Sequence, residues 1–342
     1  MSALAVLSPG LLTTVQDLGR WGHQAEGVSV AGAMDPFAHR RANALVGNHR
    51  DAATLEITLT GPEVRFEDSR FVAVAGSDFE LSVDGLGVPI GRSFTVQAGS
   101  TVRFGARRTG ARAYLAIGGG FSVRRMLGSR ATHVPTRMGG WDGRALVRGD
   151  RLPLGPVDAS ALRLNRTATH GAPMPGTARE GSSAHPTRSA AGGEDGREPG
   201  TTGHGPTVVR VLAGPQDDRF APDALESLTA EAYVVGVESN RMAYRLEGRP
   251  IRHRAGADII SDATPIGSLQ VPASGQPLLL MADRQTTGGY AKIATVITAD
   301  IGIAAQLAPG DRFRFRVCDR AEALSALIAR EQELLVLERG AP

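Results

Sequence analysis

The sequence predicts a mainly β protein, built from two related β domains with a few short helices and a helix at the C-terminus. Short apolar runs separated by glycine-containing turns recur along the chain, a spacing typical of barrels and sandwiches. A turn followed by a strand recurs in the same form at 98–104, 148–152 and 309–315, so both halves of the chain share it. The 43 glycines and 20 prolines supply the turns that such a fold needs.

Residues 1–164 are expected to form the N-terminal β domain. Asp35 and Pro36 predict the start of its clearest helix, because aspartate caps a helix N-terminus and proline suits the first turn. Gly47 ends that helix. The alternation at 55–59 predicts a strand. Five further strands are expected, at 70–75, 80–83, 93–96, 101–104 and 113–117.

Residues 165–206 break this pattern, because they have almost no large apolar residues and cannot bury enough surface to offset the entropy of ordering. They are interpreted as a disordered linker or insertion. A C-terminal β domain is expected at 207–320, with short helices at 222–228 and 300–307. Residues 321–342 are expected to form the C-terminal helix and a tail. The residues expected near one face of that helix are Leu324, Leu327, Ile328, Glu331 and Leu335.

Composition excludes several classes of function. The net charge of +3 arises from acidic and basic residues that alternate along the chain, so nothing indicates a nucleic-acid-binding surface. The one cysteine, Cys318, allows neither an intrachain disulfide nor a cysteine-based metal site, and no metal site is expected. The N-terminus lacks the basic start of a signal peptide and the apolar length of a membrane span. A cytoplasmic protein without membrane association is therefore expected.

The most informative stretch places a polar octet, 283–290, between apolar runs at 278–282 and 293–297, which predict buried strands. The octet is expected to be a loop. Gly288 and Gly289 lack Cβ, so the backbone there can take positive φ and a ligand can approach it closely. Such a loop suits an anion or a carbonyl group. A hairpin loop of hydrophilic residues is an equally good interpretation at this point.

One residue favours the ligand-binding interpretation. Lys292 is the single lysine among 38 lysines and arginines, so the other 37 are arginines. An ammonium group is a compact charge whose pKa shifts on desolvation, which a guanidinium cannot reproduce. We therefore expect Lys292 to be a required amine beside the loop. It does not follow glycine or precede serine or threonine, so it is not the lysine of a P-loop.

Six motifs in order resemble the biotin-dependent carboxyltransferase-like family. This group includes the C subunit of 5-oxoprolinase, the antagonist of the sporulation-kinase inhibitor (KipA) and the second subunit of allophanate hydrolase. The motifs cover nearly the whole chain outside 165–206. They lie at 14–20, 32–35, 128–130, 239–242 with 245–248, 270–272, and 283–290 with Lys292.

The resemblance implies two cyclophilin-like β-barrel domains. It also implies a bacterial ATP-dependent 5-oxoprolinase complex that converts 5-oxoproline to glutamate. In that complex this chain would be an amide (lactam) hydrolase subunit that works only with its partners. Those partners would be a KipI-like companion, which is the B subunit of such complexes, and an A subunit of the LamB/YcsF type. ATP would be bound with or by a partner subunit.

Two alternatives stay open. One is a urea carboxylase-like, biotin-dependent carboxyltransferase component, and the other is a non-catalytic regulator that binds a KipI-like partner. In either case no biotin is expected on this chain, because Lys292 lacks the flanking methionines of the usual biotinylation motif.

The motifs supply the candidate site residues. Asp283, Lys292 and Asp17 are the candidate catalytic groups, because carboxylates transfer protons and an ammonium stabilises developing negative charge. In an alternative role, Asp17 pairs with Arg20 and Asp283 with Arg284. Gln270 has an alternative role as well, which is to close a turn. The candidate substrate-binding residues are Gln16, Arg241, Gln270, Arg284, Gln285, Thr286, Thr287, Gly288, Gly289 and Tyr290.

Overall fold

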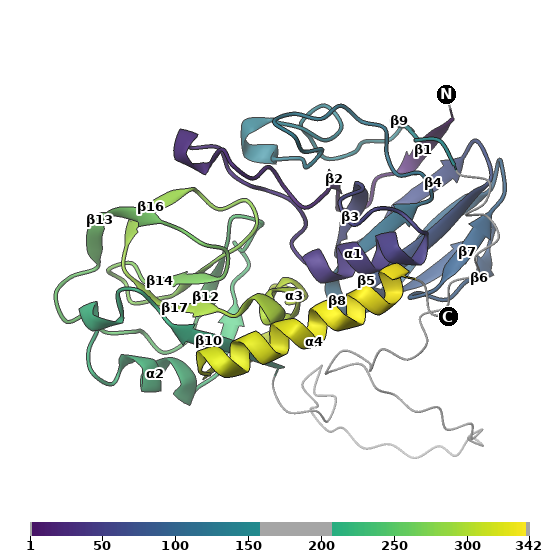
Figure 1. The fold of residues 1–342 in the computed structure, drawn as a ribbon. Helices are drawn as coiled ribbons and strands as arrows, with labels where there is room; N and C mark the ends of the chain where they lie inside the picture. Colours follow the sequence, from purple (N-terminus) through teal and green to yellow (C-terminus); the bar gives the residue numbers. More distant parts are fainter. Residues whose placement is uncertain (1, 158–206, 340–342) are drawn as a thin grey trace, which may run out of the picture.

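The structure is a computed structural model that describes residues 2–157 and 207–339. Its elements form an N-terminal sheet, a C-terminal barrel and a long helix that runs along both (Figure 1). The expectation of a mainly β fold is confirmed. The disordered segment expected at 165–206 lies outside the described residues. In the described ranges no helix is long and apolar enough to cross a membrane.

Nine strands in residues 2–157 form one curved sheet, which we call the N-terminal sheet. Its order is β2-β3-β8-β4-β1-β9, and β5 pairs with β8 and also with β6 and β7. This sheet forms an open half-barrel. The strands are β1 Ala3–Ser8, β2 Leu12–Gln16, β3 Thr54–Thr58, β4 Glu63–Phe66, β5 Arg70–Val83, β6 Leu86–Gly87, β7 Ser93–Val96, β8 Thr101–Ile117 and β9 Arg151–Pro153.

Two long strands replace four of the expected short ones. β5 covers both 70–75 and 80–83, and β8 covers both 101–104 and 113–117. The two strands pair antiparallel with register shifts that begin at Gly76, which marks a bulge and not a turn. Gly76 has a φ of 101°, and a Cβ there would collide with the Arg112 carbonyl oxygen, so the bulge requires glycine.

The helix expected after residue 35 is confirmed. α1 (Pro36–Leu45) begins with Asp35 as its cap, and the Asp35 carboxylate accepts a hydrogen bond from the Ala38 N–H at 2.9 Å. Its buried side, which includes Ala42 and Leu45, packs against β5 and β8. This packing fixes the segment just before α1, which reaches into the other domain.

The second domain is a closed barrel of seven strands, the C-terminal barrel, in the order β10-β17-β14-β15-β12-β11-β18. Its strands are β10 Thr207–Ala213, β11 Tyr233–Val235, β12 Ala243–Glu247, β14 Ser268–Gln270, β15 Leu278–Leu280, β17 Lys292–Val296 and β18 Arg312–Val317. A separate two-stranded ribbon is formed by β13 (Asp258–Ala263) and β16 (Thr287–Tyr290). Short helices lie between the strands. They are α2 Ala224–Ala230, α3 Ile301–Ala305, and the 3-10 helices η1 Gln24–Glu26, η2 Val134–Thr136, η4 Asp217–Arg219 and η5 Thr298–Asp300.

The polar octet at 283–290 is only partly a loop. Its second half is β16, which pairs antiparallel with β13. Gly288 and Gly289 do not use the freedom to take positive φ, because neither glycine is in the left-handed region. Glycine serves a different purpose at 288, where a Cβ would collide with the side-chain amide of Gln270.

Each domain has its own hydrophobic core, and the apolar side chain of Met34 reaches from one domain into the core of the other. Met34 precedes α1 in the chain but is fully buried in the core of the C-terminal barrel, together with Met281 and Ile301. The two domains are therefore packed as parts of one body.

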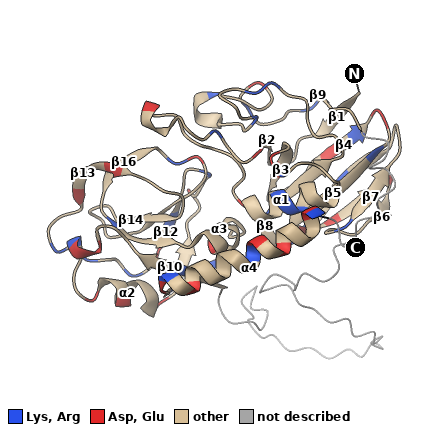
Figure 2. Cartoon of the chain, in the orientation of Figure 1, with Lys and Arg blue, Asp and Glu red and all other residues tan. Residues whose placement is uncertain are grey.

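α4 (Arg320–Arg339) lies against both domains (Figure 1). Both acidic and basic side chains occur along it (Figure 2). The expected contact face is partly wrong, because Leu324 is 58% and Ile328 47% exposed, whereas Leu334 is 4% exposed. Ion pairs contribute to the contact, since Arg40 of α1 binds Glu331 through both guanidinium Nη atoms, at 2.6 and 2.9 Å. Hydrophobic spacing alone cannot indicate a face of this kind.

Candidate functional site

A buried polar arrangement joins the two domains through Arg241. Its Nε and Nη2 each donate to the Asp283 carboxylate at 3.0 Å, and its Nη1 donates to Glu56 of β3. Its Nη2 also donates to the Gly32 carbonyl at 2.6 Å. Burial alone would lower the pKa of Arg241, but the Asp283 and Glu56 carboxylates outweigh it and raise the pKa. We call Glu56, Arg241 and Asp283 the interdomain cluster.

Glu56 connects this cluster to the N-terminal sheet. Its Oε2 accepts hydrogen bonds from the Met34 N–H and the Tyr114 hydroxyl, both at 2.8 Å. The Tyr114 oxygen accepts in turn from the Asp35 N–H at 2.8 Å. Burial, and then the nearby Glu56 carboxylate, raises the pKa of Tyr114 well above its usual value. The motif at 32–35 thus places one carbonyl and two N–H groups around the cluster.

Asp17 holds two loops together. Its Oδ1 accepts from the Gly19 N–H at 2.8 Å and from the Ser129 hydroxyl at 2.6 Å, and its Oδ2 accepts from the Arg130 N–H. All three donors belong to the family motifs at 14–20 and 128–130. The ion pair with Arg20 considered above is absent from these contacts, and the carboxylate instead positions the loops beside Arg20.

Arg20 and Gln16 present buried polar atoms with no partner. The Arg20 side chain is 1% exposed, and its Nη2 donates to the Ala131 carbonyl, but its Nε and Nη1 bind nothing within the described residues. Burial lowers the pKa of Arg20, against the opposing effects of Asp17 and Asp283. The Gln16 amide nitrogen is bonded at 3.0 Å to the Thr132 carbonyl, whereas its Oε1 has no partner in the described part of the chain.

Arg284 is a second buried guanidinium without a carboxylate partner among residues 2–157 and 207–339. Its Nε donates to the Thr264 carbonyl at 2.6 Å, and its own carbonyl accepts from the Ser29 hydroxyl at 2.9 Å across the domain boundary. Burial lowers the pKa of Arg284 to about 10, although Asp283 acts against this shift. Asp283 pairs with Arg241 and not with its neighbour in the chain, so the alternative pairing with Arg284 is wrong.

The remaining loop residues bind one another. Gln285 donates to the Gln270 side chain at 3.3 Å, and Gln270 donates to the Tyr290 carbonyl at 3.4 Å. The Thr286 carbonyl accepts from the Thr264 N–H at 3.1 Å, while Thr287 to Tyr290 form β16. Gln270 therefore positions the octet and does more than close a turn.

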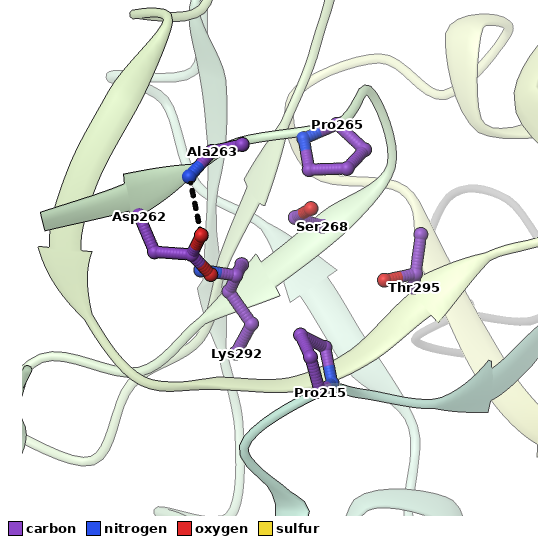
Figure 3. A pocket seen from close by; sticks show the side chains of 7 residues that line it. All are labelled: Pro215, Asp262, Ala263, Pro265, Ser268, Lys292 and Thr295. Atoms are coloured by element: carbon purple, nitrogen blue, oxygen red, sulfur yellow. Dashed lines mark hydrogen bonds and ion pairs between the residues drawn. The ribbon is translucent and has the colours of Figure 1, made fainter.

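Lys292 lies in a different place, on β17. Its Nζ donates to Asp262 Oδ2 at 2.9 Å, and its side chain is 1% exposed, whereas that of Asp262 is 48% exposed. The Lys292 hydrogen bond is the largest cause of the lowered pKa of Asp262. Together they border a pocket of about 160 Å³, which we call the barrel pocket (Figure 3). Its lining residues are Pro215, Asp262, Ala263, Pro265, Ser268, Lys292 and Thr295.

The structure thus divides the candidate residues between two places. Asp283, Arg241, Arg284, Gln16 and Asp17 lie at or near the interdomain cluster, and Lys292 lies at the barrel pocket, which no residue of 283–290 lines. Gln270 is paired with Lys292 in the barrel and bonded to Gln285, so it connects the two places. No group of three or more metal-ligating side chains occurs in the described ranges.

Sequence reasoning did not include several of these residues among its candidates. Glu56 lies on an alternating strand between Leu55 and Ile57, and a charged residue between two buried apolar ones is the signal that could have identified it. Arg20 was considered only as a partner for Asp17. Asp262 and Ser268 carry no spacing signal, because they meet Lys292 only once the barrel has formed.

The buried guanidinium groups near the interdomain cluster and the polar groups of the barrel pocket define the available chemistry. Arg20 and Arg284 offer buried cationic donors near Asp283, which suit an anionic carboxylate or a developing oxyanion. The barrel pocket offers one ammonium, one carboxylate and hydroxyl groups in a small space.

Comparison with known proteins shows which family and which proteins this chain is similar to. The family model described as carboxyltransferase domain, subdomains A and B, matches residues 26–317. The chain is 34% identical over 323 residues to the C subunit of 5-oxoprolinase from Escherichia coli (strain K12), covering 94% of each chain. It is 32% identical over 325 residues to urea amidolyase of Lachancea kluyveri, covering 92% of this chain and 17% of that one. The crystal structure of Kluyveromyces lactis urea carboxylase matches with a TM-score of 0.82 at 26% identity, covering 98% of this chain and 29% of that one.

A half-barrel and a closed barrel that share a buried polar cluster define a carboxyltransferase-type protein of two subdomains. The chain belongs to the carboxyltransferase domain family, subdomains A and B. The resemblance carried by the six motifs is confirmed. The bacterial relatives of matching length are named as subunits of 5-oxoprolinase, a multi-subunit enzyme.

Proposed function

We propose that this chain is a subunit of an ATP-dependent 5-oxoprolinase complex that converts 5-oxoproline to glutamate. The observation that carries the proposal is the 34% identity to the C subunit of Escherichia coli 5-oxoprolinase over 94% of each chain. The match to urea amidolyase covers 17% of that protein, so most of that enzyme has no counterpart here. The complex would be cytoplasmic and would contain a KipI-like companion and a LamB/YcsF-type subunit.

The buried cations suit this reaction. A lactam is stabilised by amide resonance, and opening its ring places negative charge on the former carbonyl oxygen. Preorganised donors in a water-poor site stabilise such charge strongly. In the proposal, the free N–H groups of Arg20 and the guanidinium of Arg284 supply this stabilisation, while Arg241 and Asp17 keep the surrounding loops in place.

ATP would be bound with or by a companion subunit. The barrel pocket holds about 160 Å³. Sites for drug-sized ligands hold roughly 300–1,000 Å³, so the pocket does not fit a nucleoside triphosphate. The sequence also has no lysine in a P-loop context.

The test is reconstitution with the companion subunits. The assay measures ATP hydrolysis that depends on 5-oxoproline, and glutamate formation, with this chain present or omitted. Both activities should require this chain and its companions together. Full activity from the isolated chain would contradict partner dependence, and a complete complex without glutamate formation would overturn the proposed function.

A second candidate is a biotin-dependent carboxyltransferase component. It is favoured by the 32% identity to urea amidolyase across 92% of this chain. The same reconstituted complex should be supplied with free carboxybiotin and urea. Carboxyl transfer to urea in place of glutamate formation would establish this alternative. If the chain binds its companion and neither reaction occurs, the regulatory role considered from the sequence is the one that remains.

A further inference from the structure

The barrel pocket contains buried hydrogen-bond donors that the folded chain leaves unused. Ser268 is 0% exposed, and its hydroxyl has no partner within the described residues. The Lys292 ammonium has three N–H groups, and Asp262 is the one partner that the described chain gives its Nζ. A buried donor without a partner costs about 1–3 kcal/mol. Both residues line the same pocket, so a single ligand could satisfy them together.

An oriented acceptor lies next to these donors. Asp262 Oδ2 accepts from Lys292 at 2.9 Å and from the Gln216 amide at 3.0 Å, and its Oδ1 accepts from the Ala263 N–H at 2.8 Å. These three contacts fix the carboxylate at the border of the pocket. The side chain is 48% exposed, so it can still accept from a ligand.

The other walls of the pocket are apolar or carry a hydroxyl. Lys292 and Asp262 lie on one side, Thr295 lies on the other, and Pro265 and Pro215 lie above and below (Figure 3). The rigid proline rings offer flat surfaces for a small ring. The volume of about 160 Å³ suits a single-ring molecule.

We infer that the barrel pocket binds a five-membered lactam that carries a carboxylate, which is the chemical class of 5-oxoproline. The ligand carboxylate accepts from Lys292 Nζ and Ser268 Oγ, the ring N–H donates to Asp262, and the ring lies between Pro215 and Pro265. This inference rests on the proposed function. It assigns the first binding of the substrate to the barrel pocket, whereas ring opening, which Arg20 and Arg284 assist, takes place at the interdomain cluster.

The test compares pocket variants with matched controls in the reconstituted complex. Ser268→Ala and Asp262→Asn should each raise the KM for 5-oxoproline by about three- to tenfold with little change in kcat, because each removes one ligand contact. Lys292→Arg keeps the charge but is larger and planar, so kcat/KM should fall by at least about tenfold. Ser77→Ala is the control for Ser268, since Ser77 is also a buried serine whose hydroxyl has no partner among the described residues. Asp258→Asn on β13 is the control for Asp262.

Direct binding separates this inference from the proposed function. Saturation-transfer NMR on the complex should detect 5-oxoproline, and binding should weaken for 2-pyrrolidinone, which lacks the carboxylate. An active complex whose pocket variants behave like the two controls would overturn the pocket assignment and leave the function intact. Binding of 5-oxoproline that is lost in Ser268→Ala, but without turnover, would support the pocket and overturn the proposed function. Preferential binding of biotin over 5-oxoproline would overturn the assigned ligand.

Discussion

Arg241 is the residue on which the contact between the two domains most depends. It is 6% exposed, and it neutralises Glu56 and Asp283, whose side chains are 1% and 2% exposed. Both carboxylates would remain buried without a counter-ion if the guanidinium were removed. The geometry therefore makes Arg241 a structural requirement whatever its part in catalysis.

We expect Arg241→Met to lower the free energy of unfolding by about 3–5 kcal/mol, since removing one member of a buried ion pair leaves an uncompensated charge. Denaturant titration measures this change. The control is Arg245→Met, because Arg245 and its partner Glu238 are 62% and 74% exposed. The control should change the stability by no more than about 0.5 kcal/mol. Equal stability of the two variants would contradict the assigned role of Arg241.

His39 allows a test of how the stability of the fold depends on pH. Burial lowers its pKa from 6.5 to about 4. Between these values the folded protein keeps His39 neutral, while the unfolded chain takes up a proton. Stability is therefore complete above pH 6.5 and falls by about 3 kcal/mol as the pH drops to 4.

His39→Gln should remove this contribution, so the loss of stability between pH 6.5 and 4 should be smaller than in the wild type. The measurement is a series of denaturant titrations across that range. His49→Gln is the control, because the His49 side chain is 77% exposed. An unchanged slope in His39→Gln would show that other groups cause the acid sensitivity.

Sequence motifs identified residues of the interdomain cluster but not their pairing. Arg241 and Asp283 were among the candidates, yet Asp283 was given the adjacent Arg284 as its alternative partner. Adjacent side chains diverge, and Arg241 instead reaches Glu56, which is 185 positions away in the chain. Pairings over such separations depend on how the domains pack, which a single sequence does not encode in any local pattern.

At the scale of elements, α4 differs most from its sequence pattern. Its apolar residues Leu324 and Ile328 face solvent and Leu334 is buried, while Glu331 and Glu338 form ion pairs with Arg40 of α1. A helix that lies across two domains has contacts set by both. Local periodicity correctly predicted that the helix exists, but the face depends on surfaces that are distant in the sequence.

We expect Leu334→Ala to destabilise the protein by about 2–3 kcal/mol, through lost burial and the cavity that remains. Val336→Ala is the matched control, since Val336 lies on the same helix and is 59% exposed. Thermal and denaturant unfolding of both variants provide the measurement. If both variants lose the same stability, Leu334 does not anchor α4.

For the strands, too, the local sequence pattern predicts only part of the structure. The alternation at 55–59 correctly predicted β3, because one face of that strand packs on the core. The glycine-containing turns expected between 75 and 80 and between 104 and 113 are absent, because β5 and β8 continue through Gly76, Gly105 and Gly110. A glycine fits a turn and a bulge equally well, and the partner strand decides between them.

At the scale of the whole molecule, the two domains share buried groups from both sides. Met34 fills the barrel core, and Arg112 of β8 donates to the Tyr244 hydroxyl and the Ala305 carbonyl of the other domain. The side-chain amide of Gln306 also bonds across the interface, because it donates to Asp35 Oδ2 and to the Arg112 carbonyl, each at 3.0 Å. Opening this interface would expose apolar surface and leave buried polar groups unpaired.

The domains should therefore unfold in one cooperative transition. Both tryptophans, Trp21 and Trp141, lie in the N-terminal part, so their fluorescence reports that part alone, whereas far-UV circular dichroism reports both domains. The two signals should have the same denaturant midpoint in the wild type. In the double variant Met34→Ala, Arg112→Met, the interface loses its central packing and a buried hydrogen-bond donor, so the two midpoints should separate. A wild type with two separate midpoints would show that the interface is too weak to couple the domains. A site formed between them would then need the partner subunits to hold it together.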